Sequence, residues 1–151
     1  MIIILSTILV IIDQVSKIIV TNTLTNNKSV EVIKSFFYLT YTNNKGAAFS
    51  ILTGKRILLI LVSLIVIGIL IYYIKKTKIE KKINKIALSL VIGGSIGNLI
   101  DRILKGAVID FLDFKIFGYN YPIFNLADTF IVIGVFLLLI GMFRKEEKKW
   151  L

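Results

Sequence analysis

The chain has 151 residues and a formal net charge of +10, and 56% of its residues are hydrophobic, which gives a mean hydropathy of +0.85. This apolar content exceeds the roughly 45–50% of ordinary soluble domains and indicates one small integral-membrane domain over residues 1–151. Cysteine and histidine are absent, which excludes disulfides, thiol nucleophiles, histidine bases and the usual zinc sites, and the lysines fall between apolar runs, which argues against nucleic acid binding.

Four apolar runs are long enough to cross a bilayer as helices. They cover about residues 2–20, 57–74, 86–104 and 126–143. The run 57–74 carries no charge over its 18 residues, whereas the other three contain polar residues within them or at one end. The first run lacks the basic start and small-residue cleavage site of a secretory signal peptide, so we expect it to be retained. The sequence therefore predicts an all-α membrane protein with four transmembrane helices.

The first predicted helix carries an acid–base pair. Asp13 and Lys17 lie four residues apart with the acid first, which is the favourable order for an ion pair on a helix. Ionisable residues inside a membrane either neutralise each other or contribute to a functional site. The sequence leaves both interpretations of this pair open.

The connection between the first and second helices is predicted to hold a small extracytoplasmic β-sheet, or cradle, over about residues 29–53. The stretch VEVIKSFFYLTYT is rich in β-branched and aromatic residues, and NNKG follows it as a turn signal. The alternative is an ordinary loop at the membrane surface, because aromatic residues also suit the lipid headgroup level.

The third predicted helix carries a polar stripe on one face. Gly94, Asn98, Asp101 and Arg102 are spaced by four, three and one residues, which places them together at about 100° per residue. Unpaired charge in the bilayer costs about 2.5–3.5 kcal/mol per residue, so the stripe must face protein or water. Gly93, Gly94 and Gly97 would let another backbone approach closely. A helix used only for packing is the alternative to a functional site.

The distribution of basic residues predicts the orientation in the membrane. Six lysines fall within residues 75–85 and four basic residues within 144–149, whereas residues 21–56 hold only five. Lys and Arg concentrate on the cytoplasmic side, so both termini and the middle loop are expected inside. The basic tail either sets this topology or binds anionic lipid.

The last outer connection is predicted to be an extracytoplasmic loop or short helix between the third and fourth helices. It carries Asp110 and Asp113 in VIDFLDF and then Asn125 and Asp128 in PIFNLAD. Asn125 fits a helix N-cap, with Asp128 at the third helical position, where a carboxylate favours the positive end of the helix dipole. The same position also suits a catalytic carboxylate at the membrane surface.

Two adjacent carboxyl groups that share a proton can activate water and polarise a carbonyl, as in aspartic proteases. The candidate carboxylates are Asp101, Asp110, Asp113 and Asp128. Spacing alone does not choose the pair among them. The residues by themselves thus predict a four-span protein with an acidic, outward-facing site.

Five motifs resemble those of the bacterial prolipoprotein signal peptidases, or type II signal peptidases. In order along the chain they are DQVSK (13–17), NKGAAFS (44–50), GGSIGNLIDR (93–102), VIDF (108–111) and FNLAD (124–128). The resemblance covers essentially the whole chain. It implies an aspartic endopeptidase of the plasma membrane that cuts the signal peptide from lipoprotein precursors, just before a cysteine that already carries diacylglycerol.

Carried over residue by residue, the resemblance implies a catalytic pair of Asp110 and Asp128, with Asp113 outside the motif. It also implies a set of residues that support this pair or hold the substrate, namely Asp13, Lys17, Asn44, Gly46, Asn98, Asp101, Arg102 and Asn125. Gly46, Ala47 and Ala48 would let a strand-like loop lie close over the substrate. The implied partners are diacylglyceryl-modified prolipoproteins and membrane lipids.

Two other classes remain alternatives. A small carrier or ion-conducting protein would use Asp13, Lys17, Asp101 and Arg102 as a relay, but the acidic and amide residues gather toward the outer loops. A purely structural four-helix membrane protein is the third possibility. We expect no cofactor and no metal, because the chain has no histidine and no acid-rich calcium motif, and we expect a monomer.

Overall fold

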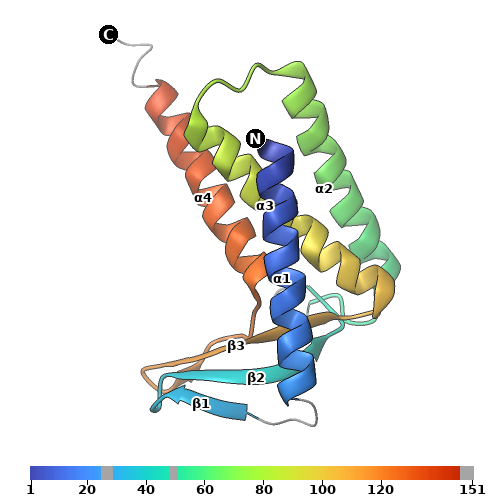
Figure 1. Cartoon of the computed structure of the whole chain (residues 1–151), viewed down its shortest axis with the longest axis vertical. Helices are drawn as coiled ribbons and strands as arrows, with labels where there is room; N and C mark the ends of the chain where they lie inside the picture. Colours follow the sequence, from blue (N-terminus) through green and yellow to red (C-terminus); the bar gives the residue numbers. More distant parts are fainter. Residues whose placement is uncertain (25–28, 48–50, 147–151) are drawn as a thin grey trace.

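Four helices run along one another and a β-sheet lies across one end of them (Figure 1). The computed structural model describes residues 1–24, 29–47 and 51–146. The helices are α1 (Ile2–Leu24), α2 (Arg56–Lys76), α3 (Lys82–Leu104) and α4 (Leu126–Glu146). Residues 48–50 of the expected β region, which include Ala48, lie outside the described residues, as does the end of the basic tail at 147–151.

Three of the helices are long and apolar enough to cross a membrane, as predicted. These are α1, α2 and α3, whereas the described apolar part of α4, Leu126–Gly141, is shorter. Each helix extends a few residues beyond at least one end of its predicted apolar run, because polar and basic residues at the ends are also helical. The fourth membrane span stays a prediction.

The sheet has four antiparallel strands in the order β1-β2-β3-β4. β1 (Ser29–Ile33) and β2 (Phe37–Asn44) confirm strands in the region between α1 and α2. The loop or short helix predicted between α3 and α4 is wrong, because that segment forms β3 (Val108–Ile116) and β4 (Tyr119–Asn120). The two aspartates make this segment resemble a loop, but β2 supplies the backbone partner, with Thr42 opposite Asp110 and Tyr38 opposite Asp113.

The helix α3 lies at the centre of the bundle and packs against α1, α2 and α4. The predicted close approach is confirmed at Gly93, Gly94 and Gly97. A Cβ on Gly93 would lie 3.1 Å from the backbone carbonyl oxygen of Ser6 in α1. A Cβ on Gly94 would collide with the backbone carbonyl of Ala127 in α4, and one on Gly97 would collide with the Asp13 carboxylate of α1. These glycines let the first turn of α4 and the polar side chains of α1 come close to the stripe on α3.

Two sets of contacts attach the sheet to the helices, one at the end of α1 and one at the segment that precedes α4. Val20 and Leu24 at the end of α1 form a buried cluster with Phe111 of β3. The segment before α4 pairs with β3, since the amide of Leu112 donates to the carbonyl of Phe124 at 2.8 Å and the amide of Phe124 donates back at 3.1 Å. The position of β3 is therefore fixed relative to the first turn of α4.

Candidate active site

Asp110 lies on β3 with its carboxylate held by two side-chain amides. Asp110 is only 2% exposed to solvent. Asn44, the last residue of β2, donates from Nδ2 to Asp110 Oδ2 at 2.9 Å, and Asn125 donates from Nδ2 to Asp110 Oδ1 at 2.6 Å. Because β2 pairs with β3, the sheet itself brings Asn44 to the carboxylate.

Asp128 lies in the first turn of α4 and forms the N-terminal capping arrangement that the sequence predicted. The amide of Asp128 donates to Asn125 Oδ1 at 2.9 Å, and the amide of Asn125 donates to Asp128 Oδ2 at 3.3 Å. The other carboxylate oxygen, Oδ1, accepts a 2.7 Å hydrogen bond from Asn98 Nδ2 of α3. The capping role therefore leaves one oxygen in contact with the polar stripe.

Asn125 connects the two carboxylates through a second amide. Its Nδ2 donates both to Asp110 Oδ1 and, at 3.2 Å, to Asn98 Oδ1, while Asn98 Nδ2 points at Asp128. Each amide thus has its donor and acceptor ends fixed by a different partner. This arrangement holds both carboxyl groups in one orientation.

Lys17 lies at the centre of a buried network of charged side chains that contacts these amides. Its Nζ lies 2.8 Å from Asp13 Oδ2 and 2.8 Å from Asp101 Oδ2, and all three side chains are fully buried. Lys17 also donates to Asn98 Oδ1 at 3.1 Å. Asp13 accepts from the backbone amide of Ala127 at 3.0 Å, which ties the network to the start of α4.

The end of α3 is held by two arginines. Arg102 donates from Nη2 to the carbonyl of Gly46 at 3.2 Å, and its Nε is buried without a partner in the described part of the chain. Arg56, the first residue of α2, donates to the carbonyls of Arg102 and Ile103, each at 2.8 Å. The loop after β2 and the start of α2 are thus both attached to the last turn of α3.

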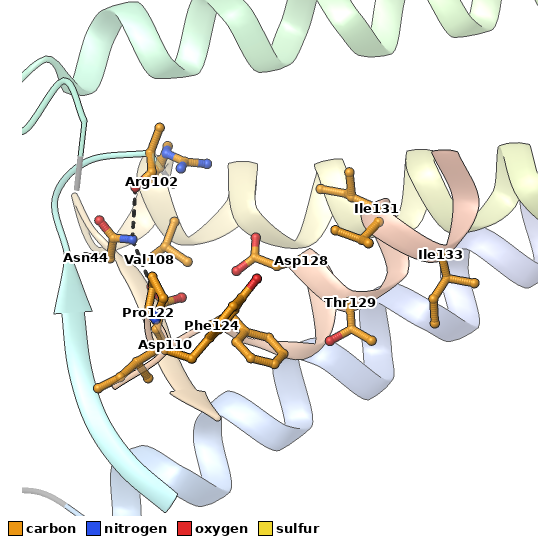
Figure 2. A pocket seen from close by; sticks show the side chains of 14 residues that line it. Asn44, Arg102, Val108, Asp110, Pro122, Phe124, Asp128, Thr129, Ile131 and Ile133 are labelled. Carbon is orange, nitrogen blue, oxygen red and sulfur yellow. Dashed lines mark hydrogen bonds between the residues drawn. The ribbon is translucent and has the colours of Figure 1, made fainter. Parts of the chain in front are cut away.

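An apolar cavity of about 500 Å³ opens beside the two carboxylates. Asp110, Asp128, Asn44 and Arg102 are its polar lining residues at one end, and Figure 2 shows Ile131 and Ile133 farther along α4. The remaining lining residues are Ala47, Val108, Tyr121, Pro122, Ile123, Phe124, Thr129 and Val132. The site therefore places two carboxyl groups at the polar end of a mostly apolar hollow.

Asp110 has an altered acidity. Burial, and after it the nearby Asp128 carboxylate, raise the pKa of its carboxyl group to about 6, against the opposing effect of the hydrogen bonds from Asn44 and Asn125. A carboxyl group with such a pKa is able to hold or release a proton close to neutral pH.

The four candidate carboxylates have separate environments. Asp101 is paired with Lys17 and, at 2.9 Å, with Lys105. Asp113 accepts a 2.8 Å hydrogen bond from Thr40 within the sheet. Of these four, only Asp110 and Asp128 line the apolar cavity. Gly46 lies beside this cavity, where its amide donates to Asn44 Oδ1 at 2.8 Å.

Sequence reasoning missed two residues of this region. Gln14 donates to the carbonyl of Gly97 and to Asp13, each at 3.1 Å, and Arg56 holds the end of α3. Arg56 carried a signal, because a cation at a helix N-terminus opposes the helix dipole and so suggests a partner elsewhere, such as the carbonyl end of another helix. For Gln14 the only signal in the sequence was its place between Asp13 and Lys17.

Apolar helices long enough to span a bilayer, combined with two carboxyl groups at the polar end of an apolar cavity, are typical of a small membrane enzyme. The signal peptidase (SPase) II family matches residues 5–144. Lipoprotein signal peptidases of Staphylococcus aureus strains JH9 and Newman are each 40% identical over 147 residues, which cover 97% of this chain and 90% of theirs. The chain therefore belongs to the signal peptidase II family, as the resemblance in its motifs indicated.

Two solved structures of bacterial membrane enzymes share the whole fold. One superposes with a TM-score of 0.91 at 39% identity and covers 98% of this chain and 90% of its own. The other has a TM-score of 0.84 at 40% identity, with 93% and 91% of the two chains covered. Family membership makes the protein a peptidase, and the carrier alternative is not favoured.

Proposed function

We propose that the protein is a lipoprotein signal peptidase of the aspartic type, in which Asp110 and Asp128 form the catalytic pair. The observation that carries this assignment is that both carboxyl groups line one apolar cavity while amides from β2, α3 and the start of α4 fix their orientation. The other two candidate carboxylates are engaged by lysines or by the sheet.

The proposed reaction is a direct hydrolysis. One aspartate takes a proton from a water molecule as the water attacks the scissile carbonyl carbon, and the other aspartate donates its proton to the developing oxyanion. The C–N bond then breaks as the first aspartate passes the proton that it took from water to the leaving amine, and the second aspartate recovers its proton from a hydroxyl group of the intermediate as the carbonyl re-forms. Because the two carboxyl groups titrate as a pair, the initial protonation belongs to the pair as a whole.

The substrate assignment rests on membership of the signal peptidase II family, and the apolar cavity is consistent with it. We propose that it takes a prolipoprotein with a diacylglyceryl-modified cysteine, cut on the amino side of that cysteine. The isoleucine-rich wall along α4 offers an apolar surface to the signal peptide and acyl chains, while Arg102 Nε, Asn44 and Asn98 offer hydrogen bonds to a substrate backbone or to the catalytic pair. Gly46 would let the loop after β2 lie close to the substrate.

The proposed placement is a single peptidase domain, residues 1–151, with four spans in the bacterial plasma membrane. The lysine-rich connection between α2 and α3 and the N-terminus lie at the end of the bundle opposite to the sheet (Figure 1). Basic connections remain in the cytoplasm, so the sheet and the active site face outward and both termini face inward.

The test is cleavage of a diacylglyceryl-modified precursor by the purified protein in detergent. We expect Asp110→Asn and Asp128→Asn to lose cleavage by at least about 10³-fold, in line with removal of an acid–base group and its partner. Asp113→Asn is the matched control, because it makes the same change on the same strand outside the cavity and should retain activity. An unlipidated precursor should not be cut.

Substantial turnover by the folded Asp110→Asn or Asp128→Asn variant would refute the catalytic pair. Failure of the folded wild-type protein to cut any lipidated precursor would refute the peptidase assignment of this chain. Ion flux in liposomes would then test the carrier alternative.

A further inference from the structure

A second hollow shares a wall with the apolar cavity. It has a volume of about 370 Å³, and the residues common to the two hollows are Asn44, Asp110, Pro122 and Ile123. The carboxylate of the proposed catalytic residue Asp110 therefore lies where the two hollows meet. A substrate bound across this point would leave one part of its chain in each.

The two hollows differ in chemistry. The first continues along α4 past Ile131, Val132 and Ile133. The second is bordered by the end of β2 and the segment that follows it, and most of its lining residues are polar, among them Thr42, Asn43, Asn44, Lys45 and Thr53. An apolar peptide segment or acyl chain matches the first hollow, and a hydrated, polar peptide segment matches the second.

Lys45 places a cationic side chain at the second hollow, which it lines together with Asp110. Its side chain is exposed, and among the described residues it forms no salt bridge. Its backbone carbonyl accepts a 3.2 Å hydrogen bond from the amide of Gly54, so the backbone at this position is held without help from the side chain. Replacing the side chain should therefore change the charge of the hollow and leave the loop in place.

We propose that this second hollow binds the polar segment of the substrate that follows the lipidated cysteine, and that Lys45 favours an acidic side chain there. The inference rests on the proposed function, because it takes the scissile bond to lie at Asp110. The signal peptide and acyl chains then occupy the apolar hollow. After cleavage the acyl chains stay attached to the cysteine of the mature product, so they leave the apolar hollow toward the lipid while the polar segment leaves the second hollow.

The expected preference is modest because Lys45 is exposed. A solvent-exposed pair of opposite charges contributes little, and salt screens it. We expect the wild-type protein to cut a precursor with Asp at the second position after the cysteine about three times faster, by kcat/KM, than the same precursor with Lys there. This ratio should approach one in high salt.

The experiment compares three lipidated precursors that differ only at that position, with Ser, Asp or Lys. Lys45→Glu should reverse the Asp-to-Lys ratio to about one third, and Lys45→Met should bring it near one. Lys34→Glu is the matched control, because Lys34 is an exposed lysine in the turn at the opposite end of β2 and lines neither hollow. It makes the same change of net charge, so a general effect of protein charge would appear in both variants.

An unchanged ratio in Lys45→Glu, or an equal shift in Lys34→Glu, would overturn the subsite. Cleavage of the Ser precursor separates this result from the proposed function. If the Ser precursor is cut at the cysteine while the ratio does not respond to Lys45, the peptidase assignment holds and only the subsite is wrong. If the wild-type protein cuts none of the three, both proposals fall together.

Discussion

At the scale of single residues, Lys17 is the cation that compensates two buried carboxylates. It pairs with Asp13 and Asp101 where neither has access to water. Lys17→Met would leave two buried carboxylates without their shared cation, so we expect a loss of about 3–5 kcal/mol in the free energy of unfolding. Thermal unfolding in detergent measures this loss.

Lys105→Met is the matched control for Lys17. Lys105 pairs with the same Asp101, but its own side chain is 37% exposed, so we expect a loss of no more than about 1 kcal/mol. Equal melting temperatures for the Lys17→Met variant and the wild type would show that the network contributes nothing to stability.

Asp110 makes stability depend on pH in a direction opposite to that of most aspartates. Its folded-state pKa of about 6 lies above its ordinary value, so the folded state holds a proton that the unfolded state releases. This contribution is complete below about pH 4 and is lost as pH rises through 6, by roughly 3 kcal/mol at about 1.4 kcal/mol per pKa unit.

Asp110→Asn removes this titration. The melting temperature of the variant minus that of the wild type should therefore rise between pH 4 and pH 7, as measured in detergent at constant ionic strength. A difference that stays flat or falls over this range would contradict a raised pKa. Asp113→Asn, on the same strand but hydrogen-bonded to Thr40, serves as the comparison.

The composition of the site was only partly predictable from the residues alone. The polar stripe on the third helix and the cap at Asn125 are local patterns, and the structure has both. The choice among four carboxylates was not local, because it depends on Lys17 and Thr40 reaching two of them from elsewhere in the fold. Only the resemblance of the motifs pointed to Asp110 and Asp128 before the structure.

At the scale of elements, the contact between α3 and α4 sets the distance between Asn98 and Asp128. Gly94 lies against the carbonyl of Ala127, so Gly94→Ala must push α4 outward. We expect a loss of about 1–3 kcal/mol in stability and a drop in kcat/KM of at least tenfold, because a small displacement of the proposed catalytic residue Asp128 is costly.

Gly68→Ala is the control for this effect. Nothing lies within 4 Å of a Cβ at Gly68 on α2, so the change should be neutral or stabilising through helix propensity. Wild-type activity in Gly94→Ala, measured with the same lipidated precursor, would show that the close approach of the two helices is not needed.

The helix α2 reaches the site through Arg56. It buries only Leu59 and Ile67, so the hydrogen bonds from Arg56 to the end of α3 are a main polar attachment. Arg56→Gln should lower stability by about 1 kcal/mol and reduce kcat/KM several-fold, because the last turn of α3 carries Arg102. Lys55→Gln removes the neighbouring charge and should change neither quantity. Equal effects of the two substitutions would exclude a specific role for Arg56.

The helices were predictable because their apolar runs are long and local, and their bounds differ from expectation by a few residues at most. β3 was not, since its burial depends on pairing with β2, which lies 64 or more residues earlier in the chain. Five of the nine residues of β3 are β-branched or aromatic, which favours a strand, but its two aspartates weaken this local signal. The pairing with β2 therefore decides the structure where the proposed catalytic residue lies.

At the scale of the whole molecule, the basic connection and the proposed active site lie at opposite ends of the bundle. The sheet and the cavity lie at one end, and the lysine-rich connection between α2 and α3 lies at the other (Figure 1). The proposed position of the site near the outer surface of the membrane rests on this separation together with the cytoplasmic preference of basic connections. An enzyme arranged this way would meet its substrates only after their mature parts had crossed the membrane.

This orientation predicts the outcome of single-cysteine labelling, for which the cysteine-free chain gives no background. Lys34→Cys lies in the exposed turn of the sheet, and Lys78→Cys lies in the opposite connection, where the lysine side chain is 90% exposed. A membrane-impermeant maleimide should label Lys34→Cys in intact spheroplasts and Lys78→Cys only after permeabilisation. Both variants should label equally in detergent, which controls for exposure. Labelling of Lys78→Cys alone in intact spheroplasts would reverse the topology and place the proposed site on the cytoplasmic side, where it could not process exported precursors.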